Sequence, residues 1–520
     1  MKKALVACAF IFAAAFILVS CQTNGTETGD LDPLAGIDLG ALDDNLIPYP
    51  WPDGMTKYKG VTMAAGGKRI DLYSVRANPT HRWSTATEVA CIQMPVAMFD
   101  MEDGPIDVVI AVSAVYKATG TSTVAVGELK DVIIRPLSSN ISHEIIGGNK
   151  IKFSLPKEGQ YSVEWNNQPE APRNALLIFA SKAETFADDE DTVTLGPGIH
   201  PDDFDVAEYK TLILQPGAVV RGRIRMNSNS KLLGRGIIDG SHLGDHIQNN
   251  PVVLPIETFG KNNIEIRGIT IFDPNAWTVQ LQTTSNVTID NLKIVSSRCN
   301  SDGISIQSSD NITITNSFFR TWDDGVVLKN YQDRNTSDIT VTDCIFWTDL
   351  AQSMEIGVET NKKGALNLNP AIYNVTFENI TVFHALHKAP LSIHNGDNAN
   401  IYSIVFKDIV IENYYTGQGD GWNYLIDITN LTGSGMGGAA SWTTVQERGT
   451  ISDVTIDGVT ILGGRPHTMV SGRFDSSQGG SISGVTIKDV YYGEGEGRIK
   501  LSAPPDGFGT IRDNTSITWQ

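Results

Sequence analysis

The second half of the chain repeats one short pattern of apolar and polar positions. Copies such as "NNIEIRGITIF" from Asn262 and "SNVTIDNLKIV" from Ser285 alternate apolar and polar residues, reach Asn, Asp or Gly, and then give a second short apolar run. Strict alternation is typical of a β-strand with one buried face, and the polar residue between the runs predicts a tight turn. Each copy therefore predicts two short strands joined by a turn. The anchor positions of the eight copies are Ile264, Val287, Ile312, Ile339, Val375, Ile404, Val454 and Val485.

The spacing of the copies favours a solenoid. Successive anchors are separated by 23 residues at the start of the series and by up to 50 later, and an earlier copy places Leu232 32 residues before Ile264. Repeats of about 20–50 residues are typical of solenoids and propellers, but a propeller blade needs about four strands in about 40–45 residues. The shortest copies cannot hold four strands. We therefore expect an all-β chain in which residues 191–520 form a right-handed parallel β-helix, with the longest intervals extruded as loops.

Residues 31–190 lack this repeat. Runs such as "IDVVIAVSAVY" from Ile106 and "NALLIFAS" from Asn174 read as strands separated by Gly and Pro turns. This pattern is typical of a β-sandwich, so we expect a β-sandwich domain ahead of the β-helix. The charged run "ETFADDEDTV" from Glu184 predicts the boundary between them.

The first thirty residues carry a targeting pattern. Two lysines precede an apolar stretch that ends in "LVSC", which resembles the lipobox of bacterial lipoproteins. We expect residues 1–20 to be a lipoprotein signal peptide, Cys21 to be lipidated, and residues 21–30 to be a flexible tether. The prediction is a secreted protein anchored to the bacterial cell envelope, with no other contact with the membrane. The alternative is an ordinary secretory signal with a chance cysteine.

Composition narrows the range of functions. The formal net charge is −19, which is unfavourable for binding nucleic acid or an anionic membrane surface. The remaining cysteines, Cys91, Cys299 and Cys344, are odd in number and lack metal-ligand spacing. We therefore expect neither a disulfide framework nor a metal site, and no cofactor.

Three aspartates have the spacing of one coil. Asp302, in "NSDGISI", precedes Asp323 by 21 residues and Asp324 by 22. Asp302 and Asp324 are each followed by Gly and a strand-like run, so neighbouring coils are expected to stack them on one face, about 4.8 Å apart. Crowded carboxylates raise one another's pKa, which suits a general acid beside a general base. Inverting glycosidases use such carboxyl groups about 6.5–9.5 Å apart, whereas the structural alternative is turn aspartates at the coil corners.

These motifs resemble two related enzyme families. "NSDGISI" and "WDDGVVLK" resemble the Asn-Thr-Asp and Asp-Asp motifs of the polygalacturonase-type β-helix hydrolases, glycoside hydrolase family 28, over roughly residues 200–520. The run from Asp323 to Gly357 resembles the dextranase and isopullulanase group, family 49, in its order of Asp-Asp, Lys, Tyr, Trp and Glu-x-Gly. Family 49 also carries a β-sandwich ahead of the helix. The chain departs from pectinases because Ala351 stands where their Gly-His-Gly histidine is expected and because no Arg-x-Lys motif follows nearby.

The resemblance implies roles for particular residues. Asp323 would be the general acid on the glycosidic oxygen, and Asp302 and Asp324 would hold and deprotonate the attacking water. The residues expected to bind substrate are Lys329, Tyr331 and Glu355 from the resemblance, Trp322 and Trp347 as sugar-stacking rings, and His384 on the same face. For the two tryptophans, packing beneath a loop is the alternative, and for His384 it is a solvated loop.

The expected partner is a polysaccharide or oligosaccharide, and the expected activity is inverting hydrolysis of an α-linked chain. The missing uronate-binding motifs and the acidic balance favour a dextranase-like enzyme acting on neutral α-glucan. One alternative is a polygalacturonase-like pectin hydrolase with altered subsites, and another is a non-catalytic β-helix that binds carbohydrate at the cell surface. A β-helix lyase would be expected to show a calcium cluster and a catalytic Arg or Lys, and neither is evident.

Overall fold

The computed structural model describes residues 32–77, 92–102, 104–116, 123–125, 128–331, 334–361, 371–417, 424–430, 448–464, 469–471, 480–502, 510–512 and 515–520. The chain divides into two compact units, Met1–Ile37 and Asp38–Gln520, and all the strands of the described residues lie in the second. The helices in the described residues are single 3-10 turns, η2 (Leu137–Ser139), η3 (His246–Gln248) and η6 (Gly495–Gly497). None of the described helices is long and apolar enough to cross a membrane.

The N-terminal part of the second unit is a β-sandwich. One sheet has the order β1-β5-β13-β12-β9 with β4 paired to β5, and the other has the order β10-β11-β6-β2-β3. The strands of the first sheet are β1 (Leu46–Pro48), β4 (Tyr73–Ala77), β5 (Ile92–Met101), β9 (Ile133–Arg135), β12 (Gly159–Glu164) and β13 (Ala175–Lys182). Those of the second are β2 (Val61–Ala65), β3 (Lys68–Ile70), β6 (Ile106–Val112), β10 (His143–Ile145) and β11 (Lys150–Leu155), and β7 (Ala114–Tyr116) pairs with β8 (Thr123–Ala125). Alternating residues such as Val108, Ile110 and Ile151 fill the space between the sheets.

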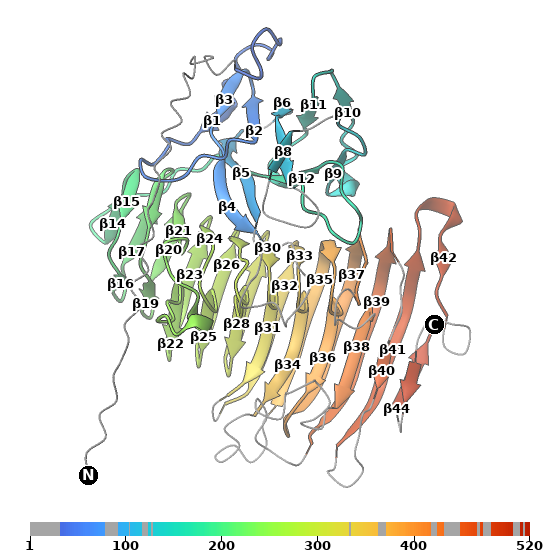
Figure 1. Cartoon of the computed structure of the whole chain (residues 1–520). Coiled ribbons are helices and arrows are strands. Elements are labelled where there is room, and N and C mark those ends of the chain that lie inside the picture. Colours follow the sequence, from blue (N-terminus) through green and yellow to red (C-terminus); the bar gives the residue numbers. More distant parts are fainter. Residues whose placement is uncertain are drawn as a thin grey trace, which may run out of the picture. The chain divides into compact units, whose positions relative to one another are not determined.

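The rest of the chain is a parallel β-helix whose coils run from β14 to β44 (Figure 1). Eleven parallel strands form one of its sheets: β16 (Phe204–Val206), β19 (Ile224–Met226), β22 (Ile256–Phe259), β25 (Val279–Gln282), β28 (Ile304–Gln307), β31 (Val326–Asn330), β34 (Met354–Thr360), β36 (Leu391–Asn395), β38 (Ile426–Asn430), β40 (Met469–Ser471) and β43 (Thr510–Arg512).

A second sheet of 20 strands closes the coils. Its members are β14 (Thr192–Leu195), β15 (Gly198–His200), β17 (Thr211–Leu214), β18 (Ala218–Val220), β20 (Lys231–Gly234), β21 (Ile237–Asp239), β23 (Asn262–Arg267), β24 (Thr270–Phe272), β26 (Ser285–Asp290), β27 (Lys293–Val295), β29 (Asp310–Thr315), β30 (Phe318–Thr321), β32 (Thr336–Thr342), β33 (Ile345–Thr348), β35 (Ala371–Ala385), β37 (Asn400–Ile411), β39 (Thr450–Ile461), β41 (Ser481–Tyr492), β42 (Ile499–Lys500) and β44 (Thr515–Trp519). As the sequence predicts, the chain forms a β-sandwich followed by a right-handed parallel β-helix.

The repeat in the sequence sets the register of the 20-stranded sheet. All eight anchors, from Ile264 to Val485, pair in a single unbroken row. Each is buried in the bore, where a large apolar side chain contributes about 1.5–3 kcal/mol relative to exposure. The expected pairing of the earlier copy, Leu232 with Ile264, is wrong, because Leu232 pairs with Ile266. A two-residue shift keeps the side chain on the same face of a strand, so the alternation alone could not detect it.

Asparagines at or near the start of successive strands form a second ladder. Asn229, Asn263, Asn286 and Asn311 all have positive φ, between 54° and 59°. The carboxamide of each donates to the one before it, at 2.7–2.9 Å. Asparagine tolerates this left-handed conformation better than most residues, which explains why it recurs at this position of the repeat.

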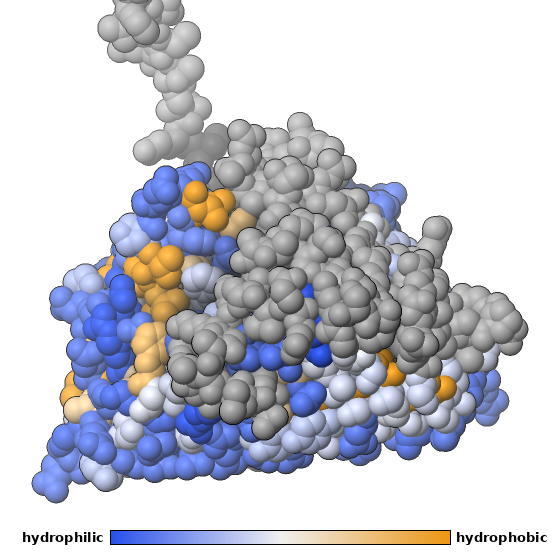
Figure 2. Space-filling model, turned by 90° about the horizontal axis from the view of Figure 1, so that it is seen from below, coloured by the Kyte–Doolittle hydropathy of each residue, from blue (hydrophilic) through white to orange (hydrophobic). Residues whose placement is uncertain are grey.

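The sandwich packs on the outside of the 20-stranded sheet (Figure 1). Val96 and Phe179 from the sandwich share one buried cluster with Phe318, Trp347 and other residues of the β-helix. Figure 2 shows the face turned downward in Figure 1, where the described surface is largely hydrophilic and hydrophobic residues gather toward the left.

Candidate active site

The β-helix stacks Asp302 and Asp324 in one column. Ile304 of β28 pairs with Val326 of β31, so the residues two positions earlier, Asp302 and Asp324, are also in register. The backbone N–H of Gly303 donates to the Asp324 carbonyl at 2.8 Å. A separation of 22 residues is thus one coil at this point, as the sequence predicts.

The glycine after each aspartate allows this close stacking. A Cβ on Gly303 would lie 2.3 Å from the carbonyl oxygen of Gly325, and one on Gly325 would lie 2.5 Å from that of Ser353. Any side chain at these positions would force the coils apart. The Asp-Gly pairs therefore serve the backbone as well as the carboxylates.

Asp323 lies beside this column, at the start of the turn into β31. Its Oδ1 accepts the backbone N–H of Asp324 at 3.1 Å, and its carboxylate accepts the backbone N–H of Asn300 from the preceding coil. Burial raises the pKa of Asp323 to about 8; the charge of Asp302 acts in the same direction and Lys329 opposes it. A carboxyl group with this pKa keeps its proton at neutral pH, which is the state that a general acid needs.

The pKa values of the other two aspartates are also raised. Burial raises the pKa of Asp324 well above its usual value, and the charges of Asp323, Asp302 and Glu355 raise it further. Burial raises the pKa of Asp302 as well, although the ammonium of Lys329 opposes this. Of the three carboxyl groups, Asp302 forms the ion pair with Lys329, and this ion pair favours its ionised form. The cluster therefore places a carboxyl group whose pKa is raised to about 8 beside one whose ionised form a lysine favours.

Lys329 links the aspartates to a second acidic group. Its Nζ lies 3.6 Å from Asp302 Oδ2 and 3.3 Å from Glu359 Oε2. These carboxylates outweigh the effect of burial and raise the pKa of Lys329 well above its usual value, so it stays charged. The hydroxyl of Tyr331 donates to Glu359 Oε1 at 2.8 Å. The structure thus brings Lys329 and Tyr331 to the aspartates, with Glu359 joining them.

A buried histidine is held between two carboxylates further along the 11-stranded sheet. His394 of β36 places Nδ1 2.7 Å from Glu355 Oε1 and Nε2 3.1 Å from Asp427 Oδ2. Burial lowers the pKa of His394, but the two acids outweigh it and raise the pKa to about 10. Glu355 Oε2 and Asp427 Oδ1 have no hydrogen-bond partner among the described residues. Glu355 therefore lies close enough to raise the pKa of Asp324, and it pairs with a cation that the sequence did not reveal.

The predicted sugar-stacking roles of Trp322 and Trp347 are wrong, because neither ring has exposed surface. Trp322 packs with Cys299 and Leu350 in a small buried cluster. Trp347 belongs to the cluster under the sandwich, with the guanidinium of Arg320 3.9 Å from its ring centre. Both tryptophans support the fold of this region, which was the alternative reading of the sequence.

His384 is likewise not a substrate-binding residue. It lies near the end of β35, on the sandwich side of the β-helix, where its Nε2 lies 2.9 Å from Glu164 Oε1 and its Nδ1 2.7 Å from the carboxamide nitrogen of Asn413. Burial lowers the pKa of His384 to about 4, so the ring is neutral at pH 7. It is neither on the face of the aspartates nor in a solvated loop.

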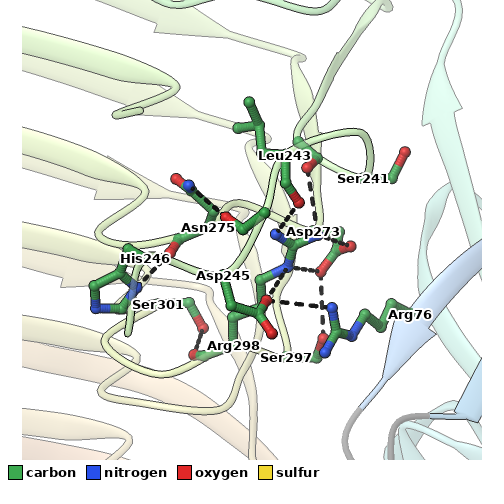
Figure 3. Close-up of polar contacts among 12 residues, drawn as sticks. Arg76, Ser241, Leu243, Asp245, His246, Asp273, Asn275, Ser297, Arg298 and Ser301 are labelled. Carbon is green, nitrogen blue, oxygen red and sulfur yellow. Dashed lines mark hydrogen bonds and ion pairs between the residues drawn. The ribbon is translucent and has the colours of Figure 1, made fainter. Parts of the chain in front are cut away.

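The segment that carries Asp302 is anchored by a buried ion pair (Figure 3). Arg298 binds both carboxylate oxygens of Asp273, at 3.1 and 2.8 Å, and donates to the carbonyl of Leu243 at 2.6 Å. Asp245 lies 3.3 Å from Arg298 and 3.4 Å from Arg76 of the sandwich. These contacts fix the backbone that leads into Asp302.

Sequence reasoning missed Glu359, His394 and Asp427. A residue at an outward position of a strand gives no sign of its role until the register of the coils is known, and Asp427 lies three strands beyond Asp324. The described residues contain no group of three His, Cys, Asp or Glu side chains placed to hold a metal ion. Cys21 and Cys91 lie outside the described residues.

Comparisons with known proteins agree with this architecture. Dex49A from Penicillium minioluteum is 15% identical and has a TM-score of 0.56, with 92% of this chain and 97% of that chain covered. An exopolygalacturonase from Thermotoga maritima is 16% identical and has a TM-score of 0.45, with 63% and 84% covered. At such identities the first likeness shows the fold alone.

At the level of sequence, an Aspergillus flavus protein whose name is that of a galacturan 1,4-alpha-galacturonidase A is 27% identical over 218 residues. The match covers 38% of this chain and 45% of that relative, so the chain spans about half of its length. A family model described as "Glycosyl hydrolases family 28" matches residues 228–491, which is just over half of the chain and includes all three aspartates. The protein belongs to the glycosyl hydrolases of family 28.

Proposed function

We propose that the protein is an inverting hydrolase of a neutral α-linked polysaccharide, dextranase-like in substrate. The observation that carries the mechanism is the column of Asp302 and Asp324 with Asp323 beside it, in which burial raises the pKa of Asp323 to about 8. One site thus offers a carboxyl group that is protonated at neutral pH next to one that a lysine favours as an anion.

The proposed reaction moves two protons. Asp323 donates its proton to the glycosidic oxygen as the bond to the anomeric carbon breaks. Asp302 and Asp324 hold a water on the opposite face of the sugar, and Asp302 takes a proton from it as its oxygen bonds to that carbon. The configuration at the anomeric carbon is inverted because the water attacks from the side opposite the leaving group. Lys329 keeps Asp302 ionised until the proton is transferred.

The charges around the aspartates favour a neutral sugar. The cations that face this region among the described residues, Lys329 and His394, are each already bound by two carboxylates. A uronate would meet a surplus of negative charge, whereas sugar hydroxyls can donate to it. A second candidate is a pectin hydrolase with altered subsites, which the family match and the name of the Aspergillus flavus relative favour.

Substitution of Asp323 by Asn tests the catalytic assignment. The variant should lose at least about a hundredfold in kcat on the substrate that the native protein cleaves among dextran, pullulan and polygalacturonate. Asp343→Asn is the matched control, because Asp343 is a turn residue with φ +56° whose carboxylate accepts from Asn379. Hydrolysis by Asp323→Asn at the native rate would refute the role of this residue.

Product stereochemistry and substrate preference distinguish the proposed function from the pectin hydrolase and from the non-catalytic surface protein. NMR of the newly formed reducing end should show the β-anomer from an α-linked chain, and an α-product would refute inversion. Cleavage of polygalacturonate in preference to both glucans would replace the neutral-glucan proposal with the pectin reading. Binding of a glycan with no turnover by the native protein would favour the non-catalytic surface protein.

We also propose that the protein is anchored to the cell envelope by lipid at Cys21, on the basis of the "LVSC" pattern. Metabolic labelling with a fatty acid should mark the native protein, and Cys21→Ser should abolish the label and release the protein from the membrane fraction. Labelling of Cys21→Ser to the native extent would refute the anchor.

A further inference from the structure

A long connection, residues 240–255, joins β21 to β22. The side chain of Asn275 fastens it at several points, since its Nδ2 donates to the carbonyls of Gly244 and Pro251 at 2.9 Å and its Oδ1 accepts from the N–H of Val253 at 3.1 Å. Arg298 holds the same connection through the carbonyls of Gly240 and Leu243. The connection is therefore fixed to the coils that carry the site (Figure 3).

The tip of this connection reaches the aspartates through Asn300. His246, in η3, has Nδ1 2.6 Å from the Asn275 carbonyl and Nε2 3.0 Å from Asn300 Oδ1. The backbone N–H of Asn300 in turn donates to the carboxylate of Asp323. Figure 3 shows the His246 ring on the opposite side of the polar cluster from Arg76, and so turned away from the sandwich. Both nitrogens of the ring are engaged, which fixes its orientation.

Trp277 stands in the same column as the aspartates. Val279 of β25 pairs with Ile304 of β28, so Trp277 is in register with Asp302, and the N–H of Thr278 donates to the Asp302 carbonyl at 3.0 Å. Trp277 thus precedes Asp302 by one coil, about 4.8 Å along the axis, and Asp324 by two. Its neighbours Ala276 and Thr278 have no exposed surface, whereas Trp277 itself is partly exposed.

The two rings lie close together. The centroids of His246 and Trp277 are 6.3 Å apart, with 41° between the planes. Trp322 and Trp347 are completely buried, whereas Trp277 is partly exposed. A partly exposed indole in register with buried carboxyl groups combines a large apolar face with an N–H donor, which suits the apolar face and hydroxyl rim of a pyranose.

We propose that Trp277, supported by His246, is the stacking platform of a sugar-binding subsite one coil to the N-terminal side of the cleaved bond. This proposal rests on the proposed function, because it takes the bond to lie at Asp302, Asp323 and Asp324. The ligand is an uncharged pyranose unit of the polysaccharide, held by its apolar face. The substrate chain then runs along the 11-stranded sheet, across the strands, with successive sugars over successive coils.

Binding measurements on an inactive background test the platform without relying on turnover. The native protein, Asp323→Asn and Asp323→Asn/Trp277→Ala are titrated by calorimetry with isomaltohexaose, maltohexaose and hexagalacturonate. The best probe should bind Asp323→Asn, and the loss of the indole should weaken it at least tenfold, with Trp277→Phe in the same background recovering most of the affinity. Equal affinity with and without the indole, or binding of none of the three probes, would overturn the proposal.

Kinetics of the single variants supply an independent check. Trp277→Ala should raise KM for the cleaved polysaccharide about tenfold with kcat changed less than threefold. The matched control is Tyr402→Ala, which removes an exposed aromatic that stacks on Tyr373 at 5.0 Å in the 20-stranded sheet and should leave KM unchanged. A lower melting temperature for Trp277→Ala and Trp277→Phe alike, with kcat and KM falling together, would show a structural residue and overturn the platform. Activity retained in Asp323→Asn would refute the catalytic assignment and leave the affinity comparison to decide the subsite.

Discussion

The buried ion network between the sandwich and the β-helix allows a prediction that needs no substrate. Arg135 of β9 donates to Glu164 Oε1 at 3.1 Å and to Glu412 Oε2 at 2.8 Å, and all three side chains are buried. Glu164 belongs to the sandwich and Glu412 follows β37 of the β-helix. Replacement of Arg135 by Met keeps most of the volume and leaves two buried carboxylates without their common cation.

The expected loss of stability is large. Removal of one partner from a buried ion pair costs about 3–5 kcal/mol, because the charge left behind stays desolvated. The unit from Asp38 to Gln520 has 483 residues, and an unfolding entropy of about 2.1 cal/mol/K per residue gives about 1 kcal/mol/K. Arg135→Met should therefore lower the melting temperature by about 3–5 °C at pH 7.5.

The pKa shift of Glu164 determines how the stability contributed by this network changes with pH. Burial raises the pKa of Glu164, but His384 and Arg135 outweigh it and lower the pKa to about 2. Because this folded value lies below the unfolded one, about 4.3, the stabilisation is complete above that pH and is lost as the pH falls toward 2. Without Arg135, Glu164 and Glu412 take up protons at a higher pH, so the deficit of the variant should be smaller at pH 4.5 than at pH 7.5.

Thermal unfolding by circular dichroism or calorimetry at pH 7.5 and 4.5 measures both effects. Arg225→Met is the control, since Arg225 also bridges several carboxylates but is 38% exposed, and such pairs should change the melting temperature by less than about 1 °C. A deficit for Arg135→Met no greater than that of Arg225→Met would refute the reasoning. So would a deficit that is the same at both pH values.

Three further predictions concern the site. If Asp323 is the general acid, kcat/KM should fall as the pH rises through about 8, because burial raises its pKa to that value; a profile flat to pH 10 would contradict this. Lys329→Met removes the cation that lowers the pKa of both Asp302 and Asp323, so the whole pH–rate profile should move to higher pH, and an unshifted profile would show that Lys329 does not tune them. The pKa of His394, raised to about 10, exceeds its unfolded value of about 6.5, so its contribution to stability is complete below pH 6.5 and is lost toward pH 10. His394→Gln should therefore flatten the decline in melting temperature over that window, and a decline equal to that of the native protein would argue against a charged His394.

The column of aspartates could be predicted because the same short motifs contain both the carboxyl groups and the strand starts that set their spacing. Asp-Gly before a strand occurs at Asp302 and again at Asp324, and 22 residues make one coil there. By contrast, Trp322 and Trp347 gave the wrong prediction for sugar stacking, because the residues next to them say nothing about what packs above their rings. Trp277, which the structure places in the same column, carries no motif of its own.

The sequence by itself determined the repeat, the alternation that fills the bore, and the recurring asparagines that adopt positive φ at or near the start of strands, because these depend on each strand and its nearest neighbours. The tertiary structure decided which outward side chains meet, since His394 reaches Glu355 and Asp427 only through the register of successive coils. The tertiary structure also decided which aromatic rings are buried, because the sandwich covers one face of the β-helix, including the ring of Trp347. Contacts between coils separated by long and unequal loops depend on the whole fold, and no local pattern encodes them.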